Sequence, residues 1–89
     1  MTENAAKFQA ELTRQYTELF KSDPEYAYAK ARTTPEAMAE KMTLGLSTGE
    51  ASKDGKGVKN ACKTLDIPCT YKSIAQYLLG ATTTGAPPT

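Results

Sequence analysis

The residues in this sequence that could do covalent chemistry are two thiols, Cys62 and Cys69, seven positions apart. A cysteine nucleophile needs a helix N-terminus or a nearby cation that lowers its pKa. Cys69 meets this condition, because it precedes a predicted helix and stands close to Lys72. The chain has no histidine, however, so the commonest general base and the usual partner of a nucleophile are both missing. We therefore predict that Cys69 packs or caps a helix and that the protein is not an enzyme.

The same two thiols bear on metal binding and on disulfides. Without histidine, a structural zinc site would need carboxylates to complete its ligands, and the carboxylates are scattered over solvated positions. A small secreted domain usually carries a denser framework of cysteines. We expect no metal and no cofactor, and we expect Cys62 and Cys69 to be buried free thiols. A disulfide between them would have to span a helix end and its turn, which disulfide geometry permits.

Positive charge is concentrated in the second half of the chain. Residues 1–50 hold six basic and eight acidic side chains, a net charge of −2, whereas residues 51–89 hold five lysines and two aspartates, a net charge of +3. Gly55-Lys56-Gly57 precedes a predicted helix, where free backbone N–H groups favour anions. The segment lacks the glycine spacing and the final Lys-Ser/Thr pair of a P-loop. It therefore favours contact with nucleic-acid phosphates over a nucleotide pocket.

Three helices are predicted in the first half of the chain. Phe8, Leu12, Tyr16 and Leu19 recur at steps of three and four, which predicts an amphipathic helix over about residues 4–21. Asp23-Pro24-Glu25 and Thr34-Pro35-Glu36 each supply an N-cap, a proline at the first position and an acid in the first turn. These signals predict helices over about 24–32 and 35–48. The helix over 35–48 has an apolar stripe formed by Met38, Met42 and Leu46.

Two more helices are predicted in the second half. Ser52 or Asp54 could cap a helix over about 55–66, which ends before Pro68 because the residue before a proline avoids the α region. A fifth helix over about 70–79 has the inner face Ile74, Tyr77 and Leu78. Residues 81–89 have no apolar periodicity, which predicts a disordered C-terminal tail. The predicted fold class is all-α, with one compact four- or five-helix domain over residues 1–80.

The last two predicted helices and their joint resemble the helix-turn-helix DNA-binding families. The residues that carry the resemblance are Ala61, Leu65, Ile67, Ile74 and Leu78. In those families, a small residue in the first helix and aliphatic residues after it hold two helices at a steep angle, and the second helix enters the major groove. This sequence departs from the pattern at Asp66, where the family usually has glycine, and in a joint that is about two residues longer.

The resemblance implies a nucleic-acid-binding regulator that acts through the basic C-terminal half. Lysines along and before the first of the two helices would neutralise phosphates, namely Lys53, Lys56, Lys59 and Lys63. Exposed residues of the second helix would face the groove, namely Thr70, Lys72, Ser73 and Gln76.

Surplus tyrosines support an alternative function. Tyrosine combines contact area with a hydroxyl group and is favoured at protein interfaces. A surface formed by Tyr16, Tyr26, Tyr28 and Tyr71 would suit a protein-binding inhibitor or adaptor of the kind that phages and mobile elements encode. The helices over 4–21 and 35–48 have apolar stripes that could extend across a homodimer interface.

The location of the protein is predicted from its apolar runs. None approaches the ~20 residues of a membrane span. Charges in MTENAAKFQAEL occupy the place of the apolar region of a secretory signal. We therefore expect a soluble, cytoplasmic protein with no membrane contact.

Overall fold

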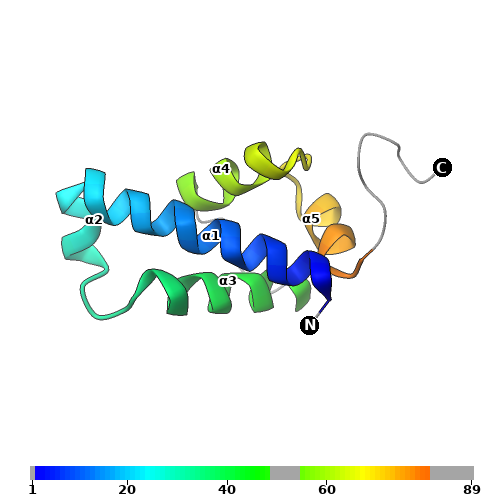
Figure 1. The fold of residues 1–89 in the computed structure, drawn as a ribbon, viewed down its shortest axis with the longest axis horizontal. Coiled ribbons are helices and arrows are strands. Elements are labelled where there is room, and N and C mark those ends of the chain that lie inside the picture. The colour runs from blue at the N-terminus through cyan, green and yellow to red at the C-terminus, as the bar shows by residue number, and fades with distance from the viewer. Residues whose placement is uncertain (1, 49–54, 81–89) are drawn as a thin grey trace.

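Helices make up most of the fold. A computed structural model describes residues 2–48 and 55–80. Within these residues it contains no strand and five helices: α1 (Glu3–Ser22), α2 (Pro24–Ala29), α3 (Pro35–Thr48), α4 (Lys56–Leu65) and α5 (Tyr71–Leu78) (Figure 1). The predicted all-α class is confirmed. Lys53, the predicted caps Ser52 and Asp54, and the predicted tail lie outside the described residues.

Most of the helices begin at a residue whose side chain accepts a backbone hydrogen bond. The Asp23 carboxylate accepts from the N–H of Tyr26 at 3.1 Å, and the hydroxyls of Thr34 and Thr70 accept at 3.1 Å from the residues three positions later. These bonds satisfy N–H groups that have no partner within the helix. α4 differs, because its N-cap is Gly55, which makes no side-chain bond. Helix starts are thus encoded locally at Asp23, Thr34 and Thr70.

The helix predicted over 24–32 ends earlier, at Ala29. Lys30 leaves the helical region, with φ −107° and ψ 21°. The N–H groups of Ala31 and Thr33 then bond to carbonyls three positions earlier, at 3.3 and 3.1 Å. Such bonds tighten the chain into successive turns, which redirect it toward Pro35, the first residue of α3.

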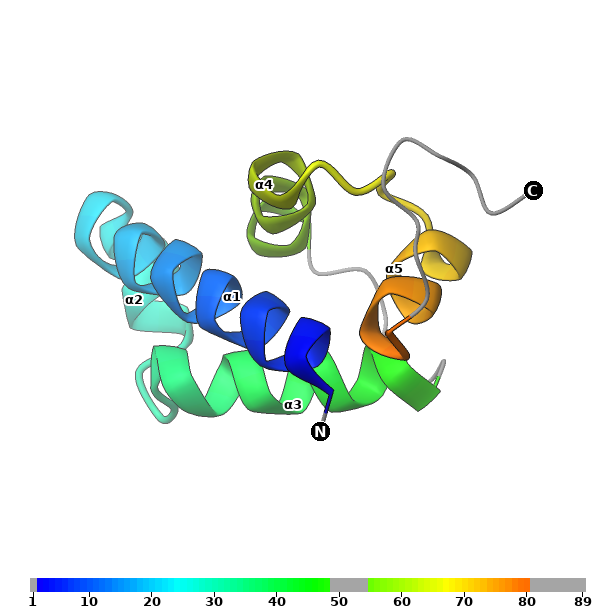
Figure 2. The ribbon, with the colours of Figure 1, turned by 45° about the vertical axis from the view of Figure 1, so that its right-hand side comes forward.

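α1 is the central element of the molecule. α3 and α4 pack along it on different sides, α2 folds against its C-terminal end, and α5 packs on α3 and on α1 (Figures 1 and 2). Phe8, Leu12 and Tyr16 have no solvent exposure. These three residues of the predicted α1 stripe are therefore covered within the chain and are not available for a dimer contact.

The buried face of α3 lies beside the predicted stripe and overlaps it. Its buried residues are Ala39, Thr43 and Leu46, whereas Met38 and Met42 are only partly buried. The two stripes are neighbours on the helix surface and share Leu46. The side chain of Ala39 is short and fully buried, which lets α1 and α3 approach closely. The long methionines then cover the edge of the core.

Thr2 joins the two ends of the described chain. Its hydroxyl accepts from the N–H of Ala5 at 3.0 Å and donates to the carbonyl of Leu78 at 2.5 Å. We expect Thr2→Ala to lower the free energy of unfolding by about 1–2 kcal/mol, because one change removes both bonds. Urea unfolding will measure the loss. Thr2→Ser keeps the hydroxyl and should retain most of the stability, and equal losses in the two variants would contradict this role.

Candidate nucleic-acid interface

The cationic surface of α4 is made by Lys56, Lys59 and Lys63, which we call the lysine stripe. All three residues are exposed. Positions three and four apart lie on one face of a helix, so the stripe is a single row. The buried residues of α4 lie on the opposite face: Gly57, Val58, Ala61 and Cys62. No acidic residue occurs from Lys56 to Leu65, so α4 presents positive charge without a carboxylate of its own.

The orientation of α4 depends on close contact with α1 at Gly57. A Cβ atom at Gly57 would lie 3.0 Å from both Cδ1 and Cζ of Tyr16, and closer still to Cε1. Tyr16 is fully buried, so its ring has little room to move. Gly57 therefore seats α4 on α1 and turns the lysine stripe outward. The sequence analysis considered Gly55-Lys56-Gly57 only as a phosphate-contacting segment. In the structure, Gly57 is instead a buried packing residue of α4.

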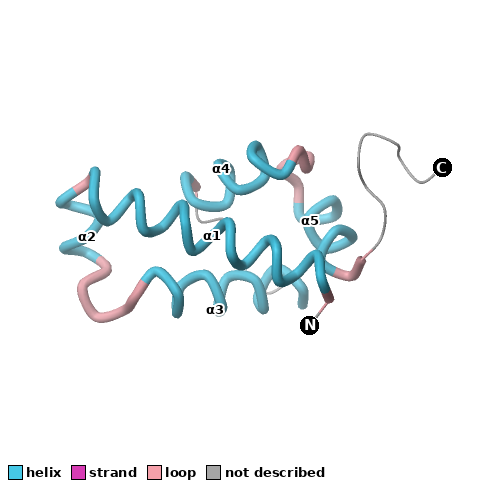
Figure 3. The backbone as a smooth tube through the Cα atoms, in the orientation of Figure 1, coloured by secondary structure: helices cyan, strands magenta, loops and turns pink. Residues whose placement is uncertain are grey.

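The helical structure is interrupted between α4 and α5, as predicted from Pro68. Asp66 ends α4 in the left-handed conformation, with φ 59° and ψ 48°, and the N–H of Ile67 bonds to the carbonyl of Cys62 at 2.9 Å (Figure 3). This is the pairing of a Schellman motif. Aspartate is among the few residues that adopt this conformation without glycine, so Asp66 replaces the expected glycine. Ile67 is 6% exposed and anchors the joint in the core.

The arrangement of the two helices differs from the helix-turn-helix expectation. The residues that carry the resemblance are buried or, for Leu65, partly buried. However, α4 packs on α1, whereas α5 packs on α3 and α1, and α4 and α5 do not form a packed pair (Figure 2). The expectation that these residues hold the two helices against each other is therefore wrong. α1 and α3 provide the support for both.

α5 offers fewer contacts than predicted. Lys72 is exposed, but Ser73 and Gln76 are partly buried. Thr70 is exposed, and its hydroxyl oxygen already caps α5 by accepting from the N–H of Ser73. Of the predicted groove-facing residues, Lys72 is thus the one with a charged group free to extend into solvent.

The predicted tyrosine surface is not a single surface. Tyr16 is fully buried, so its inclusion is wrong. Tyr26 is partly buried, and its ring meets Phe20 edge to face at 5.8 Å between centroids. Tyr28 and Tyr71 are 87% and 43% exposed, and they belong to α2 and α5, at opposite ends of the molecule (Figure 1).

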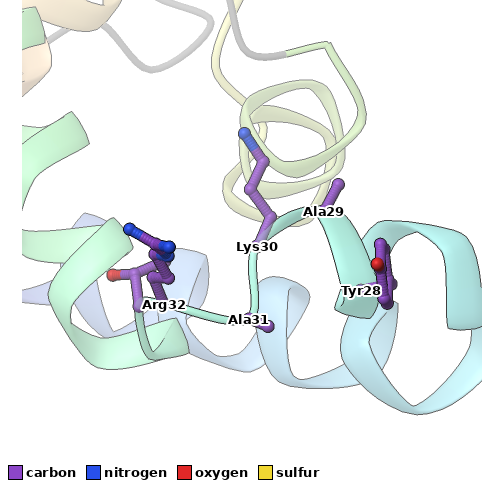
Figure 4. Close-up of a pocket in the computed structure, with 6 residues that line it drawn as sticks. Tyr28, Ala29, Lys30, Ala31 and Arg32 are labelled. Carbon is purple, nitrogen blue, oxygen red and sulfur yellow. The ribbon is translucent and has the colours of Figure 1, made fainter.

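A hollow that the sequence did not predict lies beside α2. Residues 28–33 line a volume of about 450 Å³, and both Lys30 and Arg32 are exposed there. The Lys30 ammonium lies 5.9 Å from the centre of the Tyr26 ring. Figure 4 shows the side chains of Lys30, Arg32 and Tyr28 extending in different directions from the turn. They do not converge on a common point, so we do not assign a ligand to this hollow.

Glu11 provides a polar contact between α1 and α4. Its carboxylate accepts from Arg14 at 2.6 Å and from Gln15 at 2.7 Å, and it lies near the Thr64 side chain on α4. Partial burial raises the pKa of this carboxyl group. The hydrogen bonds from Arg14 and Gln15, the positive charge of Arg14 and the nearby Thr64 side chain outweigh that effect, so the pKa lies below its ordinary value of 4.5.

This lowered pKa predicts a loss of stability in acid. The folded state holds the Glu11 proton less tightly than the unfolded state, so the contribution is present above pH 4.5 and disappears as pH falls through the folded pKa. We expect Glu11→Gln to cost about 0.5 kcal/mol near neutral pH and nothing measurable in acid. Urea unfolding of both proteins, from neutral pH down to below the folded pKa of Glu11, will measure the difference in the free energy of unfolding. A cost that does not change with pH would contradict the prediction.

No helix within residues 2–48 or 55–80 is both long enough and apolar enough to cross a membrane. In the same ranges, no three side chains among cysteine, aspartate, glutamate and histidine come together as metal ligands would. Comparison of the chain with protein-family models, curated proteins and solved structures finds no match to any of them.

Proposed function

We propose that this protein is a small, non-enzymatic nucleic-acid-binding regulator, and that the lysine stripe of α4 contacts phosphates. The supporting observation is the placement of Lys56, Lys59 and Lys63 in one exposed row, opposite the buried face of their helix. A row of ammonium groups matches the regular negative charge of a nucleic-acid backbone. Lys72 on α5 adds a fourth exposed ammonium in the same half of the chain.

The length of the stripe suits a backbone contact. Lys56 and Lys63 are separated by two turns, or about 10 Å along the helix axis. This distance corresponds to about three base pairs of B-form DNA. α4 lying along one strand can therefore neutralise several consecutive phosphates. Each neutralised phosphate releases condensed counterions, which makes the affinity depend on salt.

The proposed contact reads the backbone more than the bases. Base recognition requires side chains that reach the groove edges with free hydrogen-bonding groups. On α5, Ser73 and Gln76 are partly buried and Thr70 is engaged as a cap. We therefore expect similar affinity for duplexes of different sequence and a strong dependence on ionic strength.

A salt titration of the unmodified protein tests the proposal. Fluorescence anisotropy of a labelled mixed-sequence duplex will give the association constant at increasing NaCl concentration. Three lysine contacts predict a slope of about −3 in a plot of log K against log salt concentration. Absence of binding at low salt, or binding that does not respond to salt, would rule out the phosphate contact.

A protein-binding inhibitor or adaptor is the second candidate function. Among the three tyrosines of residues 1–50, Tyr28 is the exposed one that supports it. Tyr28 is 87% exposed, so its ring and hydroxyl group are both accessible to a protein partner. The measurement is a pull-down from nuclease-treated extract with the unmodified protein and with Tyr28→Ser. One stoichiometric protein recovered by the first and lost from the second would favour this candidate over nucleic-acid binding.

A further inference from the structure

The two thiols of the chain meet at the joint between α4 and α5. Cys62 lies in the last turn of α4 and is 1% exposed, whereas Cys69 is exposed in the joint. The prediction that both cysteines are buried is thus wrong for Cys69. The chain folds back between them, through the bond from Ile67 N–H to the Cys62 carbonyl and another from Thr70 N–H to the Pro68 carbonyl, both 2.9 Å. The Cys69 side chain is near enough to Cys62 to raise the pKa of that buried thiol.

We propose that Cys69 is a site of oxidation by hydroperoxides and that Cys62 resolves the oxidised sulfur as an intramolecular disulfide. Both cysteines are free thiols in this structure. The proposal concerns the joint and does not depend on nucleic-acid binding.

The chemistry proceeds in two balanced steps. The Cys69 thiolate attacks the terminal oxygen of hydrogen peroxide, so an S–O bond forms, the O–O bond breaks, and the hydroxide that leaves is protonated to water. The Cys62 sulfur then attacks the Cys69 sulfur, so an S–S bond forms and the S–O bond breaks. The hydroxyl group leaves as water with the proton from Cys62. Two thiols are oxidised to one disulfide, and one peroxide is reduced to two water molecules.

The difference in exposure decides which thiol reacts first. Oxidation requires a thiolate that the oxidant can reach. Burial raises the pKa of the Cys62 thiol to about 12, and the neighbouring Cys69 adds to the shift. Cys62 therefore stays protonated and protected until its partner is oxidised.

Peptide mapping of the full chain tests the proposal. The folded protein is treated with hydrogen peroxide at low protein concentration, quenched with N-ethylmaleimide and digested with trypsin. Cleavage after Lys59, Lys63 and Lys72 places the two cysteines in separate peptides, 60–63 and 64–72. We expect these two peptides to be joined, and dithiothreitol to separate them. Recovery of Cys69 as sulfinic or sulfonic acid beside a free Cys62 would overturn the proposal.

Two single variants identify the role of each thiol. In Cys62→Ala, dimedone should trap a persistent sulfenic acid at Cys69, because the resolving thiol is absent. In Cys69→Ser, Cys62 should be oxidised at least about tenfold more slowly than Cys69 is in the unmodified protein. Equal rates would contradict the assigned order. A mixture of ¹⁵N-labelled and unlabelled chains separates the two kinds of cross-link, and a disulfide found only between chains would exclude the intramolecular one.

Discussion

Gly57→Ala is expected to lower the free energy of unfolding by about 2 kcal/mol, although it adds one methyl group to a helix. In an exposed helix, the same change would stabilise the protein by about 0.5–1 kcal/mol, because alanine loses less backbone entropy. Here the new Cβ would lie 3.0 Å from Cδ1 and Cζ of Tyr16, whose side chain is fully buried. α4 must then move away from α1. For a domain of this size, the melting temperature should fall by roughly 10 °C.

A double-mutant cycle identifies the Tyr16 ring as the cause. Tyr16→Leu removes the ring and destabilises the protein by itself, but Gly57→Ala should cost much less in that background. Asn60→Ala is the matched control, because Asn60 is an exposed residue on the same helix. We expect this control to be neutral or slightly stabilising. An increase in stability for Gly57→Ala in the unmodified background would contradict the close contact between α4 and α1.

Reversing the charge of the lysine stripe is expected to weaken duplex binding at least about 100-fold at low salt. The variant is Lys56→Glu with Lys59→Glu and Lys63→Glu. The exposed ammonium groups are replaced by carboxylates that repel phosphate, so the slope of log K against log salt concentration should approach zero. The three side chains lie opposite the buried face of α4, so the fold should remain. Anisotropy measures binding, and circular dichroism checks the helix content.

A second triple variant separates the stripe from net charge. Lys7, Lys21 and Lys41 are exposed on α1 and α3, and their replacement by glutamate changes the net charge by the same amount. We expect this control to retain most of the affinity, because those lysines are not part of the stripe. Equal weakening by both triple variants would attribute binding to net charge and would remove the assignment to α4.

The local features of the fold could be read from the sequence. Asp23 and Thr34 cap helices as predicted, and each interaction spans three residues. Pro68 lies in a true break, and α5 buries its predicted inner face. Helix starts, helix stops and amphipathic faces depend on residues within about one turn of each other, which is why periodicity and capping signals predict them. The exposed row of lysines on α4 follows from the same spacing.

The tertiary structure decided which neighbouring surfaces meet. Periodicity proposed Met38 and Met42 for the core of α3, but close packing against α1 selected the shorter Ala39 and Thr43. Likewise, a pattern of aliphatic residues predicted that α4 and α5 hold each other, whereas both rest on other helices. A sequence pattern states that a face is apolar, but it does not state which partner covers the face. That choice depends on shape complementarity between residues far apart in the chain, as with Gly57 and the ring of Tyr16.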